Sequence, residues 1–157
     1  MKQASLFGGA DLSEDRNYRY RLWREWGSGP TCLFVMLNPS TADEGTDDHT
    51  IRKCTGFAMR FGAGRIFVVN LFAYRATYAE DLAKQGGVVG TDNDAILTAE
   101  ASAAQIIVAA WGDGKPQIRG LIERRASAVK ALLAPFNVYR LGELLPSGNP
   151  RHPLMLP

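Results

Sequence analysis

The segment Thr31-Cys32-Leu33-Phe34-Val35-Met36-Leu37 carries no charge and is apolar almost throughout. A strand of this composition is buried on both faces, which is typical of the interior of a parallel sheet. Residues 65–72 and 106–111 have the same apolar character, and residues 137–141 form a shorter stretch. These four segments predict the strands of one mainly parallel sheet.

A helical pattern follows the first predicted strand. Apolar residues recur at steps of three and four from about Asp48 to the Gly62-Ala63-Gly64 stretch, which predicts an amphipathic helix. The residues of its expected core face are Ile51, Cys54, Ala58 and Phe61.

Further helices are expected between the later strands. Thr91 and Asp94 resemble a capping box that opens a helix reaching about residue 104. Pro116 marks the start of another helix, which Pro135 ends, and a short helix is expected over residues 79–84. Alternating strands and helices predict helices on both faces of the sheet.

The N-terminal region is expected to add one antiparallel strand. Residues 18–26 alternate with period two, and the turn at residues 27–30 leads into the first apolar strand, so the two are expected to be antiparallel neighbours. Residues 1–15 mix glycines with charges and predict a loosely held arm. Residues 1–157 are therefore expected to form a single α/β domain, a three-layer sandwich with a mainly parallel four-stranded sheet plus an antiparallel N-terminal strand.

The composition is that of one globular domain. The chain has 157 residues, 46% of them hydrophobic and 22% charged, and its net charge of +2 is too small to indicate nucleic acid by itself. Cys32 and Cys54 make no metal-ligand pattern and are expected to be reduced core residues. No apolar run is long enough to cross a bilayer and no secretory signal is recognisable, so we expect a cytoplasmic protein without a membrane partner.

Polar residues stand at the end of each predicted parallel strand. Asn38 follows the first strand, Asn70 lies near the end of the second, and Trp111-Gly112 ends the third. His152 lies in the tail that follows the fourth strand. Because ligands bind at the carboxyl ends of parallel strands, these residues predict a single ligand pocket.

The first two polar strand ends each allow a functional and a structural interpretation. Pro39 restrains Asn38 to an extended conformation beside Ser40, where the carboxamide could orient a water molecule or read a ring edge; a plain turn explains the same residues. Asn70 is costly to bury unless a ligand or the neighbouring backbone satisfies its amide.

The later segments are equally open to two interpretations. Phe72 offers a face for stacking on a base and Arg75 a partner for phosphate, with core packing and a surface ion pair as the alternatives. Trp111-Gly112 leads to a helix N-terminus that would suit an anion, although a tight turn explains it too. His152, braced by two prolines, could donate a hydrogen bond or act as an acid or base.

The acidic segment Asp43-Glu44-Gly45-Thr46-Asp47-Asp48-His49 could hold a divalent cation. It lacks the alternating spacing of a calcium loop, and acidic residues before a helix are expected from the helix dipole. The preferred interpretation is that Asp47 or Asp48 caps the helix, so no metal and no cofactor is predicted.

Several segments resemble a known bacterial family. The segments are 36–43, 48–52, 69–77, Ala110-Trp111-Gly112 and His152-Pro153-Leu154. Together they are similar to the family catalogued as domain of unknown function 1643, over a stretch from about Tyr18 to the chain end. That resemblance implies no established activity.

A more distant likeness implies a chemistry. The chain is similar to the uracil-DNA glycosylase superfamily, with Asn38-Pro39 in place of the first motif and Asn70 in place of the base-reading Asn. Trp111-Gly112 is similar to the third motif, and His152-Pro153-Leu154 to the late His loop. Ser40 stands where several branches of that superfamily have glycine, and no DNA-wedging loop is recognisable after Leu154. The likeness implies N-glycosidic cleavage, in which Asn38 positions water, Asn70 reads the base and His152 stabilises the departing base.

The resulting hypothesis is a domain that recognises a nucleobase, a nucleotide or nucleic acid, including single strands, and hydrolyses N-glycosidic bonds. The expected catalytic residues are Asn38 and His152, and the expected substrate-binding residues are Pro39, Ser40, Asn70, Phe72, Arg75, Trp111 and Gly112. The alternatives are a non-catalytic nucleotide- or nucleic-acid-binding module, a metal-dependent phosphoesterase that uses residues 43–49, and an interaction protein with a partner surface around Trp23 and Trp26.

Overall fold

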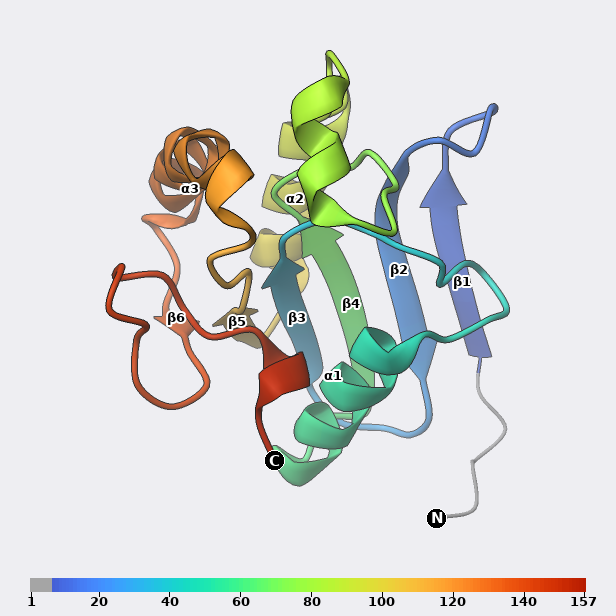
Figure 1. The fold of residues 1–157 in the computed structure, drawn as a ribbon. Helices are drawn as coiled ribbons and strands as arrows, with labels where there is room; N and C mark the ends of the chain where they lie inside the picture. Colours follow the sequence, from blue (N-terminus) through green and yellow to red (C-terminus); the bar gives the residue numbers. More distant parts are fainter. Residues whose placement is uncertain (1–6) are drawn as a thin grey trace.

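A six-stranded mixed sheet with the order β1-β2-β4-β3-β5-β6 lies at the centre of the structure, a computed structural model that describes residues 7–157 (Figure 1). The elements in chain order are β1 (Phe7–Leu12), β2 (Arg19–Glu25), β3 (Thr31–Met36), α1 (His49–Arg60), β4 (Arg65–Asn70), the 3-10 helix η1 (Ala79–Lys84), α2 (Asn93–Ala103), β5 (Ile106–Ala109), η2 (Pro116–Ile118), α3 (Arg119–Leu133), β6 (Val138–Tyr139) and η3 (Pro153–Met155).

Strand β3 occupies the middle of the parallel part of the sheet. It pairs in parallel with β4 on one side and with β5 on the other, so that Cys32 stands opposite both Ile66 and Ile106. Every residue of β3 is buried, as its unbroken apolar sequence predicts. The prediction of an α/β fold with a mostly parallel sheet is confirmed.

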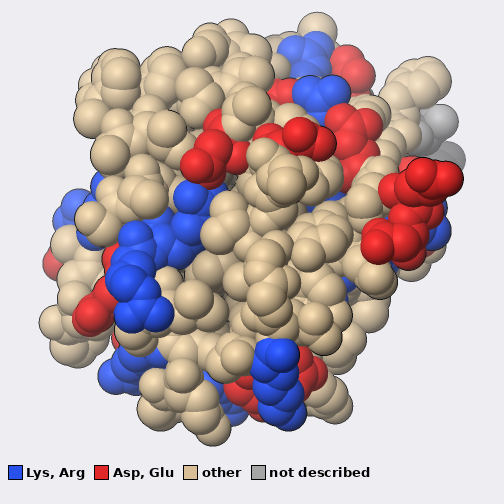
Figure 2. Space-filling view, turned by 90° about the horizontal axis from the view of Figure 1, so that it is seen from above, with Lys and Arg blue, Asp and Glu red and all other residues tan. Residues whose placement is uncertain are grey.

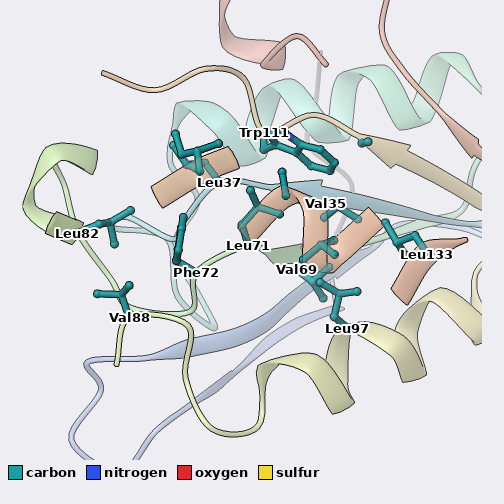
Figure 3. Packing of buried hydrophobic residues seen from close by; sticks show 14 of the residues in the cluster. Val35, Leu37, Val69, Leu71, Phe72, Leu82, Val88, Leu97, Trp111 and Leu133 are labelled. Atoms are coloured by element: carbon teal, nitrogen blue, oxygen red, sulfur yellow. The ribbon is translucent and has the colours of Figure 1, made fainter. Parts of the chain in front are cut away.

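Helices cover the sheet on both faces and complete three layers. On one face, Cys32 and Phe34 of β3 pack in a cluster with Ile51 and Cys54 of α1. On the other face, the alternate residues of β3 pack with residues of α2 and α3, in the cluster shown in Figure 3. Cys32 and Cys54 are buried free thiols, in agreement with the sequence interpretation.

The N-terminal strand differs from the prediction in its neighbour. Strand β2 is antiparallel, but it pairs with β4 and β1 rather than with β3. The reason lies in the turn at residues 27–30, where the amides of Trp26 and Gly27 donate to the carbonyl of Gly64 and the amide of Gly64 donates to the carbonyl of Pro30. Because of these bonds, the turn crosses over the start of β4, and β4 lies between β2 and β3 in the sheet.

Other elements also differ in detail from the expectation. Residues 7–12 form β1 on the sheet edge where a loose arm was expected, and residues 1–6 of that arm lie outside the described part of the chain. Phe61 is 42% exposed instead of lying on the core face, because α1 ends at Arg60 and Gly62 turns the chain with a φ of 81°.

The capping box expected at Thr91 is not formed. Helix α2 has Asp92 at its N-cap without a side-chain bond, because Asp94 accepts instead from Nη2 of Arg125 at 2.5 Å. The last strand is also shorter than expected, with only Val138 and Tyr139 pairing with β5. Within residues 7–157, none of the helices combines the length and hydropathy needed to span a membrane.

Two glycine substitutions test this packing. A Cβ on Gly64 would lie 2.6 Å from the carbonyl oxygen of Gly27 and 2.7 Å from the amide nitrogen of Gly29, whereas a Cβ on Gly56 in α1 meets nothing within 4 Å. We expect Gly64→Ala to lower the free energy of unfolding by about 2 kcal/mol, because the backbone must move apart. Gly56→Ala should raise it by about 0.8 kcal/mol. Urea denaturation measures both, and equal effects would contradict the turn packing.

Candidate functional site

A small cavity of about 40 Å³ lies at the carboxyl ends of β3 and β4, on the face that α1 covers. Its polar wall is made by residues from five separate parts of the chain, namely Arg19, Asn38 and Ser40, Asp48, Asn70 and His152. Pro39 also lines it, together with Met36, Thr50, Ile51 and Val68. The volume accommodates about one or two water molecules.

Asn70 contributes the most unusual side chain of the cavity. It is the last residue of β4, is 1% exposed, and stands opposite Met36 in the parallel ladder. Neither Nδ2 nor Oδ1 of its carboxamide has a hydrogen-bond partner among the described residues. A buried amide without a partner is costly, so its persistence points to a ligand or water that completes it.

The backbone of Asn70 is held from the opposite side of the sheet. Nδ2 of Asn93, a fully buried residue of α2, donates to the carbonyl of Asn70 at 2.9 Å and to that of Leu71 at 3.2 Å. Nε of Arg125 donates to the same Leu71 carbonyl at 2.6 Å. These contacts fix the strand end while the carboxamide of Asn70 remains free to face the cavity.

Arg19 reaches the cavity because of a bulge in β2. Asp11 pairs with Arg21 but Leu12 pairs with Arg19, so Tyr20 is an additional residue on the β2 side. A bulge of this kind reverses the alternation of side chains, and Arg19 therefore faces α1 together with Leu22.

Arg19 brings a positive charge into this buried site. Its side chain is almost completely buried; Nη1 donates to the carbonyl of Ala42 at 3.1 Å, and Nε has no partner among the described residues. Burial lowers the pKa of Arg19 to about 10, and the nearby Asp48 carboxylate partly opposes that shift. The guanidinium therefore remains charged at neutral pH.

Asn38 is oriented by its own loop. Its Nδ2 donates to the carbonyl of Pro39 at 3.0 Å and to that of Ala76 at 2.9 Å, so both amide protons are used. Oδ1 receives no hydrogen bond from the described residues. Asn38 can consequently accept a hydrogen bond from a ligand or water, but it has no proton left to donate.

Asp48 caps α1 and also faces the cavity. Its Oδ1 accepts from the amide of Ile51 at 3.0 Å, which confirms the interpretation of this residue as a helix N-cap. Asp48 is the only carboxylate among the residues that line the cavity. The sequence analysis preferred a structural role for Asp48 and otherwise considered it only as a metal ligand of a phosphoesterase.

The other acids of the segment 43–49 have partners of their own. Nε of Arg24 donates to Asp47 at 2.7 Å, Arg16 pairs with Glu44 at 2.7 Å, and Asp43 accepts from the amides of Gly45 and Thr46. Nowhere in residues 7–157 do three His, Cys, Asp or Glu side chains gather in a way that could hold a metal ion.

One of the two ring nitrogens of His152 is occupied by a hydrogen bond from the backbone. Its Nδ1 accepts a hydrogen bond from the amide of Leu154 at 3.1 Å, so the neutral ring carries its proton on Nε2. Burial lowers the pKa of His152, an effect that Asp48 partly opposes, and the imidazole is neutral at neutral pH. His152 therefore acts as a neutral hydrogen-bond donor.

Trp111 and Gly112 do not line this cavity, but they hold the segment that carries His152. Nε1 of Trp111 donates to Oδ1 of Asn149 at 3.1 Å, and the amide of Gly112 donates to the carbonyl of Pro150 at 2.9 Å. Gly112 has a φ of 70°, and a Cβ there would lie 3.1 Å from Cβ of His152. Glycine thus permits the close approach of the tail.

Phe72 and Arg75 also lie outside the cavity. Phe72 is completely buried in the cluster on the opposite face of the sheet, near Leu82 and Val88, where it has no free face for a base (Figure 3). The guanidinium of Arg75 donates to the backbone carbonyls of Ser40, Arg16 and Thr41 at 3.2–3.4 Å. Arg75 thereby shapes the loop after Asn38.

The fold and cavity together define an open-sheet α/β domain with one polar site at the carboxyl edge of its parallel strands. The chain belongs to the family described as "Protein of unknown function (DUF1643)", whose family model matches residues 19–154. Neither the curated proteins nor the solved structures include a significant match to this chain.

The protonation of His152 gives a testable pH dependence. Because its pKa is lowered on folding from 6.5, the unfolded chain binds more protons around and below that pH, and stability should fall as the pH drops from neutral through 6.5. His152→Asn keeps an acceptor for the Leu154 amide but removes the titration. In urea denaturation, the wild-type protein should lose more stability than the variant over this range; parallel pH profiles would contradict the assignment.

Proposed function

We propose that the cavity recognises the hydrogen-bonding edge of a nucleobase, either free or as part of a nucleotide or nucleic acid. The observation that carries this proposal is the buried carboxamide of Asn70, which has an unpartnered donor and an unpartnered acceptor side by side. A carboxamide of this kind forms two parallel hydrogen bonds with a ring edge that carries an adjacent acceptor and donor.

The neighbouring groups favour bases with carbonyl oxygens. Nε of Arg19 and Nε2 of His152 are both donors on the wall of the cavity, and they require acceptors. Uracil, hypoxanthine and xanthine place N–H groups beside carbonyl oxygens and so supply both kinds of partner. The cavity volume of 40 Å³ is smaller than a ring, so the edge of the base enters it and the remainder stays outside.

The same site supports hydrolysis of an N-glycosidic bond. Water attacks the anomeric carbon, the bond to the base nitrogen breaks, and its electron pair departs with the base. Oδ1 of Asn38 orients the water, and the Asp48 carboxylate takes its proton. The positive Arg19 and the Nε2–H of His152 stabilise the negative charge that develops on the base.

Two alternative functions, a binding module and a metal-dependent phosphoesterase, differ from this proposal in the residues or the activity that they require. A binding module would keep the recognition by Asn70 without turnover. A metal-dependent phosphoesterase would need Asp43, Asp47, Asp48 and His49 to act together. Asp43 and Asp48 are instead engaged with backbone amides, and Asp47 is engaged with Arg24. No contact described above favours the phosphoesterase.

Replacement of Asn70 should separate ligand recognition from stability. Asn70→Leu removes an unsatisfied buried amide at similar volume, so the free energy of unfolding should rise by about 1 kcal/mol, while thermal stabilisation by uracil, hypoxanthine or xanthine should disappear. Thr55→Val is the matched control, because Oγ1 of Thr55 is also buried without a partner and does not line the cavity.

The control variant should keep the ligand effect in full. If none of the three bases stabilises the wild-type protein, or if Asn70→Leu responds as strongly as Thr55→Val, the recognition proposal is wrong.

Turnover is tested with purified protein and DNA, RNA and nucleosides that contain uracil, hypoxanthine or xanthine. Asp48→Asn keeps the helix cap, since Asn is an equally good N-cap residue, but it cannot take a proton. We expect base release to fall about 100-fold in this variant with little change in base binding. Binding without base release from any substrate across pH would leave the domain as a recognition module only.

A further inference from the structure

A second and larger cavity, of about 740 Å³, lies between the end of α3, strands β5 and β6, and the loop of residues 142–150. It shares no lining residue with the site at Asn70. Its volume falls within the range of roughly 300–1,000 Å³ that is typical of small-molecule sites.

The floor of this second cavity is apolar and partly aromatic. Trp111 and Leu133 reach it from the buried cluster of Figure 3, and Phe136 packs against the same cluster. At its rim Tyr139 is 60% exposed and Val138 38% exposed, so large apolar side chains remain in contact with water. A ligand with a planar apolar body would cover them.

Two cations stand among these apolar residues. Lys130 and Arg140 both line the cavity, and neither forms an ion pair within 4.0 Å in the described part of the chain. Nε of Arg140 donates only to the carbonyl of Gly142, at 3.0 Å. Uncompensated positive charge beside an apolar floor complements an anionic head group.

The surrounding sequence strengthens the positive potential. Apart from Arg125, which pairs with Asp94, the basic residues between 115 and 151 are Lys115, Arg119, Arg124, Lys130, Arg140 and Arg151, against the two acids Glu123 and Glu143. Figure 2 shows a group of Lys and Arg side chains on the side where α3 and β6 lie in Figure 1, and a group of Asp and Glu side chains on the β1 side.

We infer that this cavity is a second binding site, for a small molecule that joins an aromatic or apolar body to an anionic head such as a carboxylate or phosphate. The apolar body lies against Phe136, Val138 and Tyr139, above the buried Trp111, and the head pairs with Lys130 and Arg140. A second copy of the chain fits less well, because a two-fold interface would bring the unpaired cations of both copies together. The inference does not depend on the function proposed for Asn70.

Isothermal titration calorimetry with three naphthalene probes tests this inference. We expect 1-naphthyl phosphate and 1-naphthoate to bind more tightly than neutral 1-naphthol. The double variant Lys130→Gln with Arg140→Gln should weaken both anions about tenfold and leave 1-naphthol unchanged. Lys115 lies outside the cavity, so Lys115→Gln should leave the affinity for both anions unchanged. The Asn70→Leu variant should bind all three probes like the wild type.

Three results would overturn the inference. They are equal affinity for 1-naphthol and the two anions, unchanged anion binding in the double variant, and a dimer in sedimentation velocity that Tyr139→Asp dissociates. The last result would make the cavity part of an interface between copies.

Discussion

Burial of β3 on both faces is the constraint on which the rest of the structure depends. A strand whose six residues are all buried needs a paired strand on each edge and a covering helix on each face, and the chain supplies these with β4, β5, α1 and the α2–α3 pair. Polar side chains are thereby excluded from the strand interior and can gather only where the strands end. The cavity at Asn70 is a consequence of this arrangement.

Much of the central architecture could be predicted from local sequence. The unbroken apolar run at residues 31–37 predicts a doubly buried strand, and the spacing of Ile51 and Cys54 predicts the face of α1, because both patterns depend on residues close together in the chain. The position of β2 could not be predicted in this way. It depends on hydrogen bonds between the turn at 27–30 and Gly64, which lies far along the sequence.

The candidate site could be predicted only for those residues whose position follows from the end of a predicted strand. Asn38, Asn70 and His152 line one cavity because each ends or follows a strand or lies in the segment that Gly112 holds there. Arg19 carries no such signal, since strict alternation would direct it to the opposite face, and only the additional residue in β2 brings it to the cavity. Phe72 shows the opposite error, in which an aromatic residue near the site belongs to the core.

Buried polar groups of two kinds lie at the end of β4: some hold the backbone in place, and others leave polar atoms without a partner beside the cavity. Asn93 and Arg125 are buried and direct donors at backbone carbonyls, so that they fix the strand end. Asn93 leaves only its Oδ1 without a partner and Arg19 only its Nε, whereas Asn70 leaves both carboxamide atoms unpartnered, on the side of the cavity. Each such atom costs free energy when left without a partner, and among the described residues only Asn70 leaves both polar atoms of one side chain in this state. Their retention beside a neutral, singly oriented His152 is the pattern of a site that is completed by a ligand.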